Sequence, residues 1–320
     1  MTRRTRLLVP VFLALLALAA TAPGVFALSA RYPSESLGAR GSNVEAIQAT
    51  LISKDYPIPF DGIFGVETRD AVRDFQLHHG LPVTGIVNGA TWDRLLTRVG
   101  PGSVGMPVRV LQRELDAKRH SGLAIDGIYG SRTRAAVIAF QKHMGLGQTG
   151  VVTLQTWRWL IWHYETPVFN ATTLCDYSVG NGPANWATSD AIGQLEAAAA
   201  VVAGEGHGRV AVGDASFEHG GNIPGHVTHE KGLDVDVRLM RDDRNQCRAA
   251  TTYRRATYDR AATLALIRAI RATAPGHVKL IYFNDPVLIK QGLVQAYPGH
   301  DDHLHIRYCE PGYPDPMYRC

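Results

Sequence analysis

An internal repeat with a spacing of 65 residues limits the folds that the first half of this chain can adopt. Asp61–Gly65 reads Asp-Gly-Ile-Phe-Gly, and Asp126–Gly130 reads Asp-Gly-Ile-Tyr-Gly. The same spacing relates further pairs, including Thr68/Thr133, Val72/Val137, Phe75/Phe140, Gln76/Gln141 and Trp92/Trp157. A repeat of this length predicts two copies of one small structural module.

Each copy reads as a helical unit. Thr68, Val72 and Phe75 follow the four-then-three spacing of one helix face, and their counterparts in the second copy do the same. Shorter patterns before and after them predict one more helix on each side, which gives three-helix modules over residues 38–97 and 103–162. Gly- and Pro-containing stretches at Val99–Ser103 and Glu165–Pro167 predict linkers.

The amino terminus has the layout of a secretory signal. A basic start is followed by an apolar run from Leu7 to Ala20, and small residues suited to cleavage occur at Ala22, Ala27 and Ala30. The run is shorter than the roughly 20 residues that a membrane span needs. We therefore expect a cleaved signal peptide over residues 1–30, with an uncleaved anchor as the alternative, and no stable membrane association after cleavage.

Charge gives no reason to expect a nucleic-acid partner. The chain has 33 basic and 29 acidic residues, and the leader contains Arg3, Arg4 and Arg6, so 30 basic residues remain against 29 acidic ones. A nearly neutral mature protein lacks the basic excess typical of nucleic-acid binding. We expect a monomer.

Two short stretches about seventy residues apart concentrate histidine and aspartate. The first is His226–Asp236, which contains His226, His229, Asp234 and Asp236, and the second is His300–His305, which contains His300, His303 and His305. Imidazole and carboxylate are ligands that Zn²⁺ accepts when no thiolate is offered, and three of them plus a water make a hydrolytic centre. The pattern predicts a zinc hydrolase.

Strand periodicity gives these spacings their meaning. Apolar and polar residues alternate from Leu233 to Leu239 and from His303 to Tyr308, so Asp234, Asp236, His303 and His305 are expected on the polar faces of two strands. Positions two apart on a strand are separated by roughly 6.6 Å, close enough for both histidines of His-x-His to serve one site. A tight turn at Gly232 would fold His229 back beside Asp236.

These residues resemble the penicillin-insensitive murein endopeptidases, within the wider group of lysostaphin-type and D-alanyl-D-alanine metallopeptidases. The resemblance covers roughly residues 170–312 and rests on Val212-Gly213-Asp214, Gly220-Gly221, the stretch from His226 to Asp236 and the stretch from Gly299 to His305. It implies zinc ligation by His229, Asp236 and His305. It also implies that His303 orients or deprotonates the attacking water, and that His226 and His300 are further active-site histidines.

Two departures from that family pattern are visible. His219 precedes Gly220-Gly221 where the resemblance leads us to expect arginine, and the aromatic residues before Gly299-His300 are reduced to Tyr297 followed by Pro298. A related carboxypeptidase would carry a glutamate shortly before His-x-His, and residues 295–302 contain none. The resemblance therefore favours an endopeptidase acting on peptide crosslinks, over a carboxypeptidase.

The repeats closely resemble the three-helix peptidoglycan-binding module. The resemblance rests on the Asp-Gly-x-Phe/Tyr-Gly turn, the following Thr-x-x-Ala-Val-x-x-Phe-Gln helix and the Thr-Gly exit before Thr-Trp. It implies peptidoglycan as partner and a secreted, wall-associated or periplasmic location. Two weak sites in tandem would raise the local concentration of the enzyme on a repetitive polymer. The paired apolar positions themselves are interpreted as packing residues rather than ligand contacts.

The C-terminal half, residues 168–320, predicts an α+β zinc peptidase domain with a mainly antiparallel sheet. Its four cysteines include no Cys-x₂-Cys pair, and an even number in an exported chain favours two disulfides. Three pairings are possible, and we favour Cys175 with Cys320 and Cys247 with Cys309. Other functions stay open: a non-catalytic wall-binding protein with a structural zinc site closed by His226, or a peptidoglycan amidase or carboxypeptidase.

Overall fold

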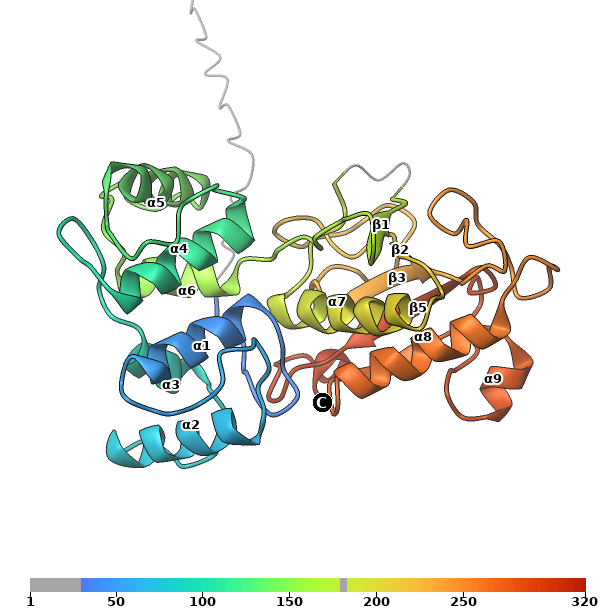
Figure 1. Cartoon of the computed structure of the whole chain (residues 1–320), viewed down its shortest axis with the longest axis horizontal. Coiled ribbons are helices and arrows are strands. Elements are labelled where there is room, and N and C mark those ends of the chain that lie inside the picture. Colours follow the sequence, from blue (N-terminus) through green and yellow to red (C-terminus); the bar gives the residue numbers. More distant parts are fainter. Residues whose placement is uncertain (1–29, 179–182) are drawn as a thin grey trace, which may run out of the picture.

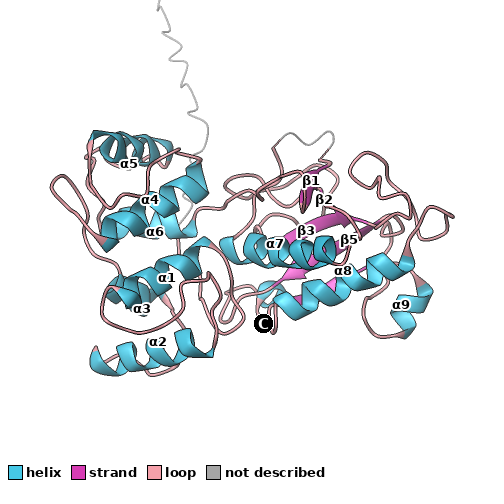
Figure 2. Cartoon of the chain, in the orientation of Figure 1, coloured by secondary structure: helices cyan, strands magenta, loops and turns pink. Residues whose placement is uncertain are grey.

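The computed structural model describes residues 30–178 and 183–320, so the expected signal sequence lies almost wholly outside the described residues. Within them, a helical N-terminal half stands beside a C-terminal half built from a sheet and helices (Figures 1 and 2). No helix in the described ranges is long and apolar enough to cross a membrane. The predicted multidomain class is confirmed.

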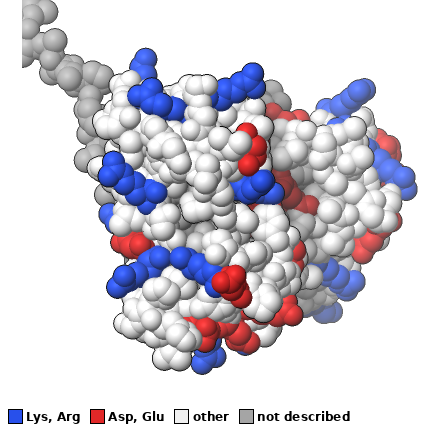
Figure 3. Space-filling model, turned by 60° about the vertical axis from the view of Figure 1, so that its left-hand side comes forward, with Lys and Arg blue, Asp and Glu red and all other residues white. Residues whose placement is uncertain are grey.

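Two three-helix units make up the N-terminal half. Module 1 contains α1 Ser42–Ile52, α2 Val66–His78 and α3 Gly89–Leu95, and module 2 contains α4 Met106–Arg119, α5 Ser131–His143 and α6 Leu154–Trp162. On the module side, Lys and Arg side chains are spread over the visible face and interrupted by uncharged surface (Figure 3). Contacts of these modules with a polymer would thus involve neutral surface as well as charge.

Buried glutamines hold the Asp-Gly turn of each module. The Gln48 side chain donates to Asp61 Oδ1 over 2.8 Å, and Gln112 donates to Asp126 Oδ1 over 2.7 Å. Gly62 in the turn has φ 67°, a left-handed conformation that glycine adopts without a Cβ clash. The paired apolar side chains are at most 2% exposed: Val72, Phe75, Trp92, Val137, Phe140 and Trp157. Their predicted role in packing is confirmed.

The C-terminal half is a five-stranded sheet in the order β1-β2-β3-β5-β4, and only β1 and β2 pair in parallel. The strands are β1 Leu174–Asp176, β2 Val210–Val212, β3 Asp234–Arg238, β4 Val278–Tyr282 and β5 His303–Tyr308. Helices α7 Ser189–Gly204 and α8 Arg260–Thr273 pack together and share one apolar core with the sheet, while α9 Pro286–Lys290 lies beyond α8 (Figure 1).

The alternation in the sequence explains which side of the sheet these helices cover. Val235 and Val237 of β3 and Leu304 and Ile306 of β5 are fully buried in the core shared with α7 and α8. Because successive strand residues point to opposite faces, the polar residues between them point away from the helices. The mainly antiparallel sheet is confirmed. Strand β1 was not predicted, because three residues are too few to show a period.

Module 1 docks directly on the C-terminal domain at two glycines. A Cβ on Gly193 of α7 would lie 2.7 Å from the backbone nitrogen of Gly41, at the start of α1. Ser189 Oγ accepts from the Asn43 backbone N–H over 3.1 Å, and the Arg40 side chain donates to the carbonyl of Thr273 over 2.7 Å. Close backbone approach of this kind leaves no room for a side chain.

The two stretches predicted as linkers connect successive units, and contacts hold both of them in place. Val99 pairs with Val152 in an antiparallel bridge and is 1% exposed, whereas Pro101 and Gly102 form an exposed turn. Glu165 pairs with Ala187 in another bridge, and its carboxylate forms an ion pair with Lys118 at 3.1 Å. The connections are therefore short and fixed.

Near this ion pair lies a buried acid with an unusual pKa. Burial raises the pKa of Glu114 from 4.5 to about 8, although the Lys118 ammonium lies 4.0 Å away. A carboxyl group whose pKa is raised on folding contributes to the stability of the folded state. This contribution is fully present below the pKa that the group has in the unfolded chain, and it is lost as the pH rises through the pKa in the folded state. Between about pH 4.5 and 8 the folded state should therefore lose stability with increasing pH.

We expect Glu114→Gln to flatten this pH dependence. The neutral amide has nearly the shape of the protonated acid, so the variant should match the wild type near pH 5 and unfold several degrees higher near pH 8. Thermal unfolding followed by circular dichroism between pH 5 and 9 measures the difference. Glu205→Gln, at the exposed end of α7, is the control and should leave the curve unchanged. Parallel wild-type and Glu114→Gln curves would contradict the expectation.

The disulfides join other cysteines than predicted. Cys175 pairs with Cys247, and Cys309 pairs with Cys320, so the predicted pairs of Cys175 with Cys320 and Cys247 with Cys309 were wrong. Cys175 lies on β1 at one edge of the sheet, whereas Cys309 follows β5, three strand positions away. The bridge between Glu310 and Arg319 brings Cys320 next to Cys309, so Cys320 is also about three strand spacings of about 4.8 Å from Cys175, beyond the reach of a disulfide.

Candidate metal centre

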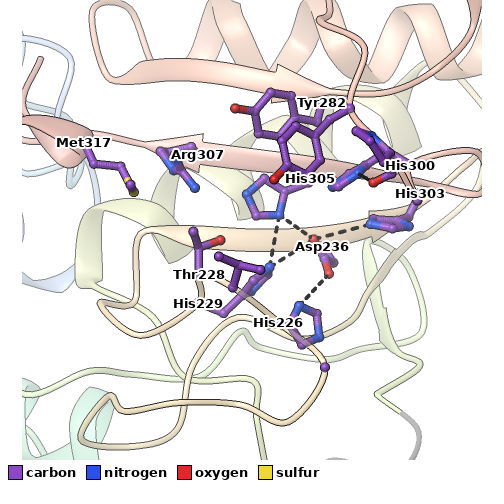
Figure 4. Close-up of a pocket in the computed structure, with 15 residues that line it drawn as sticks. His226, Thr228, His229, Asp236, Tyr282, His300, His303, His305, Arg307 and Met317 are labelled. Carbon is purple, nitrogen blue, oxygen red and sulfur yellow. Dashed lines mark hydrogen bonds and ion pairs between the residues drawn. The ribbon is translucent and has the colours of Figure 1, made fainter.

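Strand register brings two of the predicted ligands side by side. In the antiparallel pair of β3 and β5, Asp236 is directly opposite His305, and Arg238 is opposite His303. The side chains of Asp236 and His305 point away from the α7 and α8 face toward the same space (Figure 4). Sequence alternation fixes the face on which these groups lie, and the register fixes their separation.

His229 reaches the same space from the segment between β2 and β3. Gly232 has φ 65° and reverses the chain, as predicted, while His229 itself has φ 75°, which is uncommon for a residue with a side chain. Its Nδ1 lies 3.0 Å from the carbonyl oxygen of Ala215, and its ring is 1% exposed. Left-handed backbone held at a non-glycine residue is typical of functional sites.

The Asp234 carboxylate fixes the orientation of the His305 ring. Its Oδ1 lies 3.0 Å from His305 Nε2 and 2.7 Å from Arg307 Nε, and its Oδ2 accepts from the Tyr318 hydroxyl over 2.7 Å and from the His229 backbone N–H over 3.3 Å. The carboxylate of Asp234 is fully buried. Such a partner on the far side of an imidazole sets its tautomer.

These partners leave three acceptor atoms facing one another. A carbonyl and a carboxylate can only accept, so His229 carries its hydrogen on Nδ1 and His305 on Nε2. The free atoms then converge: His229 Nε2 lies 3.0 Å from His305 Nδ1, His305 Nδ1 lies 3.0 Å from Asp236 Oδ1, and His229 Nε2 lies 3.3 Å from Asp236 Oδ1. Lone pairs at such separations repel unless a metal ion or a proton lies between them.

The spacing fits zinc. Tetrahedral bonds of 2.0–2.1 Å place ligand atoms roughly 3.3 Å apart. The three separations, 3.0, 3.0 and 3.3 Å, lie at or slightly below this value, and the neutral imidazoles and the carboxylate are the donor types that zinc accepts. The residues present therefore fit the metal that the sequence predicts.

The pKa values of the side chains in this site also indicate that positive charge is favoured there. Burial would lower the pKa of His305, but hydrogen bonds to Asp234 and Asp236 outweigh it and raise this pKa to about 9. Burial would raise the pKa of Asp236, but the neighbouring histidines, His229 first, hold it well below its usual range. Without a metal, a proton on His305 balances the carboxylates.

The other three predicted residues surround this centre. His303 Nδ1 lies 2.8 Å from Asp302 Oδ1, and its Nε2 lies 3.9 Å from Asp236 Oδ1. His226 Nδ1 lies 3.8 Å from Asp236 Oδ2, and His300 Nδ1 donates to the Pro298 carbonyl over 3.0 Å. All six predicted residues line a single cavity of about 410 Å³ (Figure 4).

The sequence reasoning missed several residues of this site. Asp234 was noted only as part of a motif, and Asp214, which lies 3.0 Å from His226 Nε2, was not given a role. Tyr282 and Tyr297 stack with ring centroids 4.6 Å apart along the cavity wall. The available signal was the alternation that puts Asp234 and Arg307 on the polar faces of their strands, and only the strand register places them opposite each other.

Comparison with protein families agrees with this organisation. Residues 40–95 and 105–160 each match the peptidoglycan binding domain, and residues 181–281 match the penicillin-insensitive murein endopeptidase family. The match to the murein endopeptidase family includes His226, His229 and Asp236, whereas β5, which carries His303 and His305, lies beyond that match. Two peptidoglycan-binding modules followed by a murein endopeptidase domain are the architecture of a cell-wall hydrolase.

Two curated relatives are similar to part of this chain. The chain is 31% identical over 149 residues to the N-acetylmuramoyl-L-alanine amidase CwlL of Bacillus licheniformis, covering 36% of this chain and 41% of that protein. It is 34% identical over 109 residues to the N-acetylmuramoyl-L-alanine amidase CwlM of Mycobacterium tuberculosis (strain ATCC 25618 / H37Rv), covering 30% of this chain and 27% of that protein. The chain thus spans less than half the length of either relative.

Proposed function

We propose that this protein is an exported zinc-dependent endopeptidase that hydrolyses peptide crosslinks of peptidoglycan. The observation that carries the proposal is the convergence of His229 Nε2, His305 Nδ1 and Asp236 Oδ1 as three acceptors within 3.3 Å of one another. These three residues would hold the metal. A single carboxylate among the ligands would leave the centre net positive, as an electrophilic catalyst requires.

Bound zinc would polarise a peptide carbonyl and lower the pKa of water from 15.7 to about 7. The protein's own contribution begins with His303. Its Nδ1–H donates to Asp302, which leaves the lone pair of Nε2 toward the cavity. There it can take a proton from the attacking water and pass it to the amine as the C–N bond breaks.

His300 and His226 flank the reacting position. His300 lies with its ring centroid 4.7 Å from that of His303, and His226 lies 4.3 Å from His229. Asp214 accepts from Nε2 of His226 and so fixes that ring. We assign both histidines to orienting the water and stabilising the oxyanion that forms on the carbonyl.

The substrate follows from the two halves of the chain together. Modules that match a peptidoglycan binding domain precede the catalytic half, and that half matches a murein endopeptidase family. A D-alanyl bond to a diamino acid in the crosslink is the scissile bond we propose. The stacked Tyr282 and Tyr297 form an apolar wall against which a peptide stem can lie.

An amidase is the second candidate, because the two relatives above are amidases of the bond between muramic acid and L-alanine by name. A third is a wall-binding protein with a structural zinc, for which His226 Nδ1, 3.8 Å from Asp236, would be the fourth ligand. The three candidates predict different products.

Digestion of purified peptidoglycan by the full chain, followed by mass spectrometry, tests the proposal. We expect crosslinked dimers to be converted to disaccharide-peptide monomers with one added water per bond. A chelator such as 1,10-phenanthroline should stop the reaction, and added Zn²⁺ should restore it. Stem peptides free of sugar would identify an amidase, no released fragment would identify a binding protein, and undiminished cleavage in chelator would overturn the zinc mechanism.

A further inference from the structure

A second group of histidines lies at the junction of module 2 and the C-terminal domain. His143 is the last residue of α5, His163 follows α6, and Glu218 and His219 belong to the segment between β2 and β3. We name these four residues the junction cluster. None of them lines the cavity of the candidate metal centre.

The donor atoms of the junction cluster have the spacing of a metal site. His219 Nε2 lies 3.0 Å from His143 Nε2, and Glu218 Oε1 lies 3.2 Å from His143 Nε2 and 3.5 Å from His163 Nε2. All four donor atoms lie within 4.8 Å of one another. Tetrahedral zinc places its ligand atoms roughly 3.3 Å apart.

His163 provides an independent indication of a cation. Its side chain is fully buried, and Nδ1 lies 2.6 Å from the carbonyl oxygen of Tyr164, so Nδ1 carries the hydrogen. Nε2 is then a lone pair that faces the Glu218 carboxylate, and it has no hydrogen-bond partner. An acceptor buried against an anion is costly unless a cation lies between them.

The cluster is open to solvent on one side. Its residues would bind a metal as neutral imidazoles and a carboxylate. The side chains of His143, Glu218 and His219 are 25–31% exposed, so an ion can reach them from solvent.

Arg119, at the end of α4, occupies the edge of this cluster. Its guanidinium donates to Glu218 Oε1 and lies 3.2 Å from His143 Nε2. Its positive charge partly balances the Glu218 carboxylate. On metal uptake it would shift to the second oxygen of Glu218 or to solvent, since its side chain is 28% exposed.

We propose that His143, His163, Glu218 and His219 form a second divalent transition-metal site of the zinc class, which ties module 2 to the segment carrying His226 and His229. Three imidazoles and one carboxylate close a tetrahedral shell, so this site holds structure rather than a reactive water. It uses His219 at the position where the sequence analysis expected arginine. Module 1 has no equivalent, because the position that corresponds to His163 is Arg98.

The test uses the full chain carrying His229→Ala and His305→Ala, so that the candidate metal centre cannot contribute. Equilibrium dialysis and titration with Co²⁺ should give one bound equivalent, with the absorption of a tetrahedral complex, and Zn²⁺ should displace it. Adding His143→Asn and His219→Asn should lower the affinity at least 100-fold. The matched control is His78→Asn, the equivalent of His143 in α2 of module 1, which should retain one equivalent.

Metal in this background should also raise the unfolding temperature in proportion to the logarithm of its concentration, and the double asparagine variant should lose that response. Circular dichroism of the metal-free variants checks that the fold persists. No bound equivalent, or an equivalent that survives His143→Asn and His219→Asn, would overturn the proposal. The result is independent of whether the protein is an endopeptidase, because two of the three catalytic ligands are replaced in every variant compared.

Discussion

Replacing His305 or Asp236 with alanine is expected to abolish both metal retention at the catalytic site and peptidoglycan cleavage. Each residue supplies one of three converging acceptors, and two remaining protein ligands are too few for a stable zinc site. His305 also anchors Asp234 through Nε2, so its loss leaves a buried carboxylate with fewer partners. We expect cleavage to fall by at least 10³-fold.

Elemental analysis of the dialysed protein and release of soluble fragments from purified walls measure the two effects. His303→Ala is the matched control: it lies on the same strand but donates to Asp302, so it should keep the metal while losing activity by about 10²–10⁴-fold. If the junction cluster also binds zinc, each ligand variant should lose one equivalent rather than all metal. Full activity in a variant without catalytic metal would refute the zinc mechanism.

Asp234→Ala is expected to have the largest effect on stability. The substitution would leave the Arg307 guanidinium, whose side chain is 7% exposed, without its carboxylate, and the Tyr318 hydroxyl without its acceptor. Breaking a buried ion pair by removing one partner costs about 3–5 kcal/mol. His305 would lose the group that sets its tautomer, so metal affinity should fall by about 10–100-fold.

Urea unfolding of the metal-free protein measures the first effect, and competition with a chromophoric chelator measures the second. Asp234→Asn keeps the shape and one acceptor oxygen, so it should be less damaging than alanine in both measurements. Asp70→Ala breaks an aspartate–arginine contact on the surface of α2, where both side chains are at least 34% exposed, and should change neither. An Asp234→Ala protein as stable as the wild type would show that the buried pair contributes nothing net.

Periodicity accounts for what could be predicted. The repeat fixed the modules because the same residues recur at one spacing, and buried Phe75 and Phe140 occupy equivalent places in the two copies. The alternation around Asp236 and His305 predicted two strands with polar and apolar faces, and both strands form as expected. Local patterns of this kind depend only on neighbours in the sequence.

Contacts between distant segments could not be predicted. The pairing of Cys175 with Cys247 depends on strand order, which no single strand encodes. The role of Asp234 depends on its hydrogen bond from the Tyr318 hydroxyl, and Tyr318 lies 84 positions further along the chain. The junction cluster depends on how module 2 meets the C-terminal domain, so histidines that looked unrelated in the sequence could not be assigned to one site.

The glycine contact between α1 and α7 bears on how such an enzyme would approach its polymer. Because the backbones of Gly41 and Gly193 leave no space for a methyl group between them, module 1 cannot swing freely on a tether. A wall strand gripped by that module would meet the catalytic cavity at a set distance and angle. Choice among scissile bonds would then be governed by the geometry of the murein lattice as well as by the chemistry of the stem peptide.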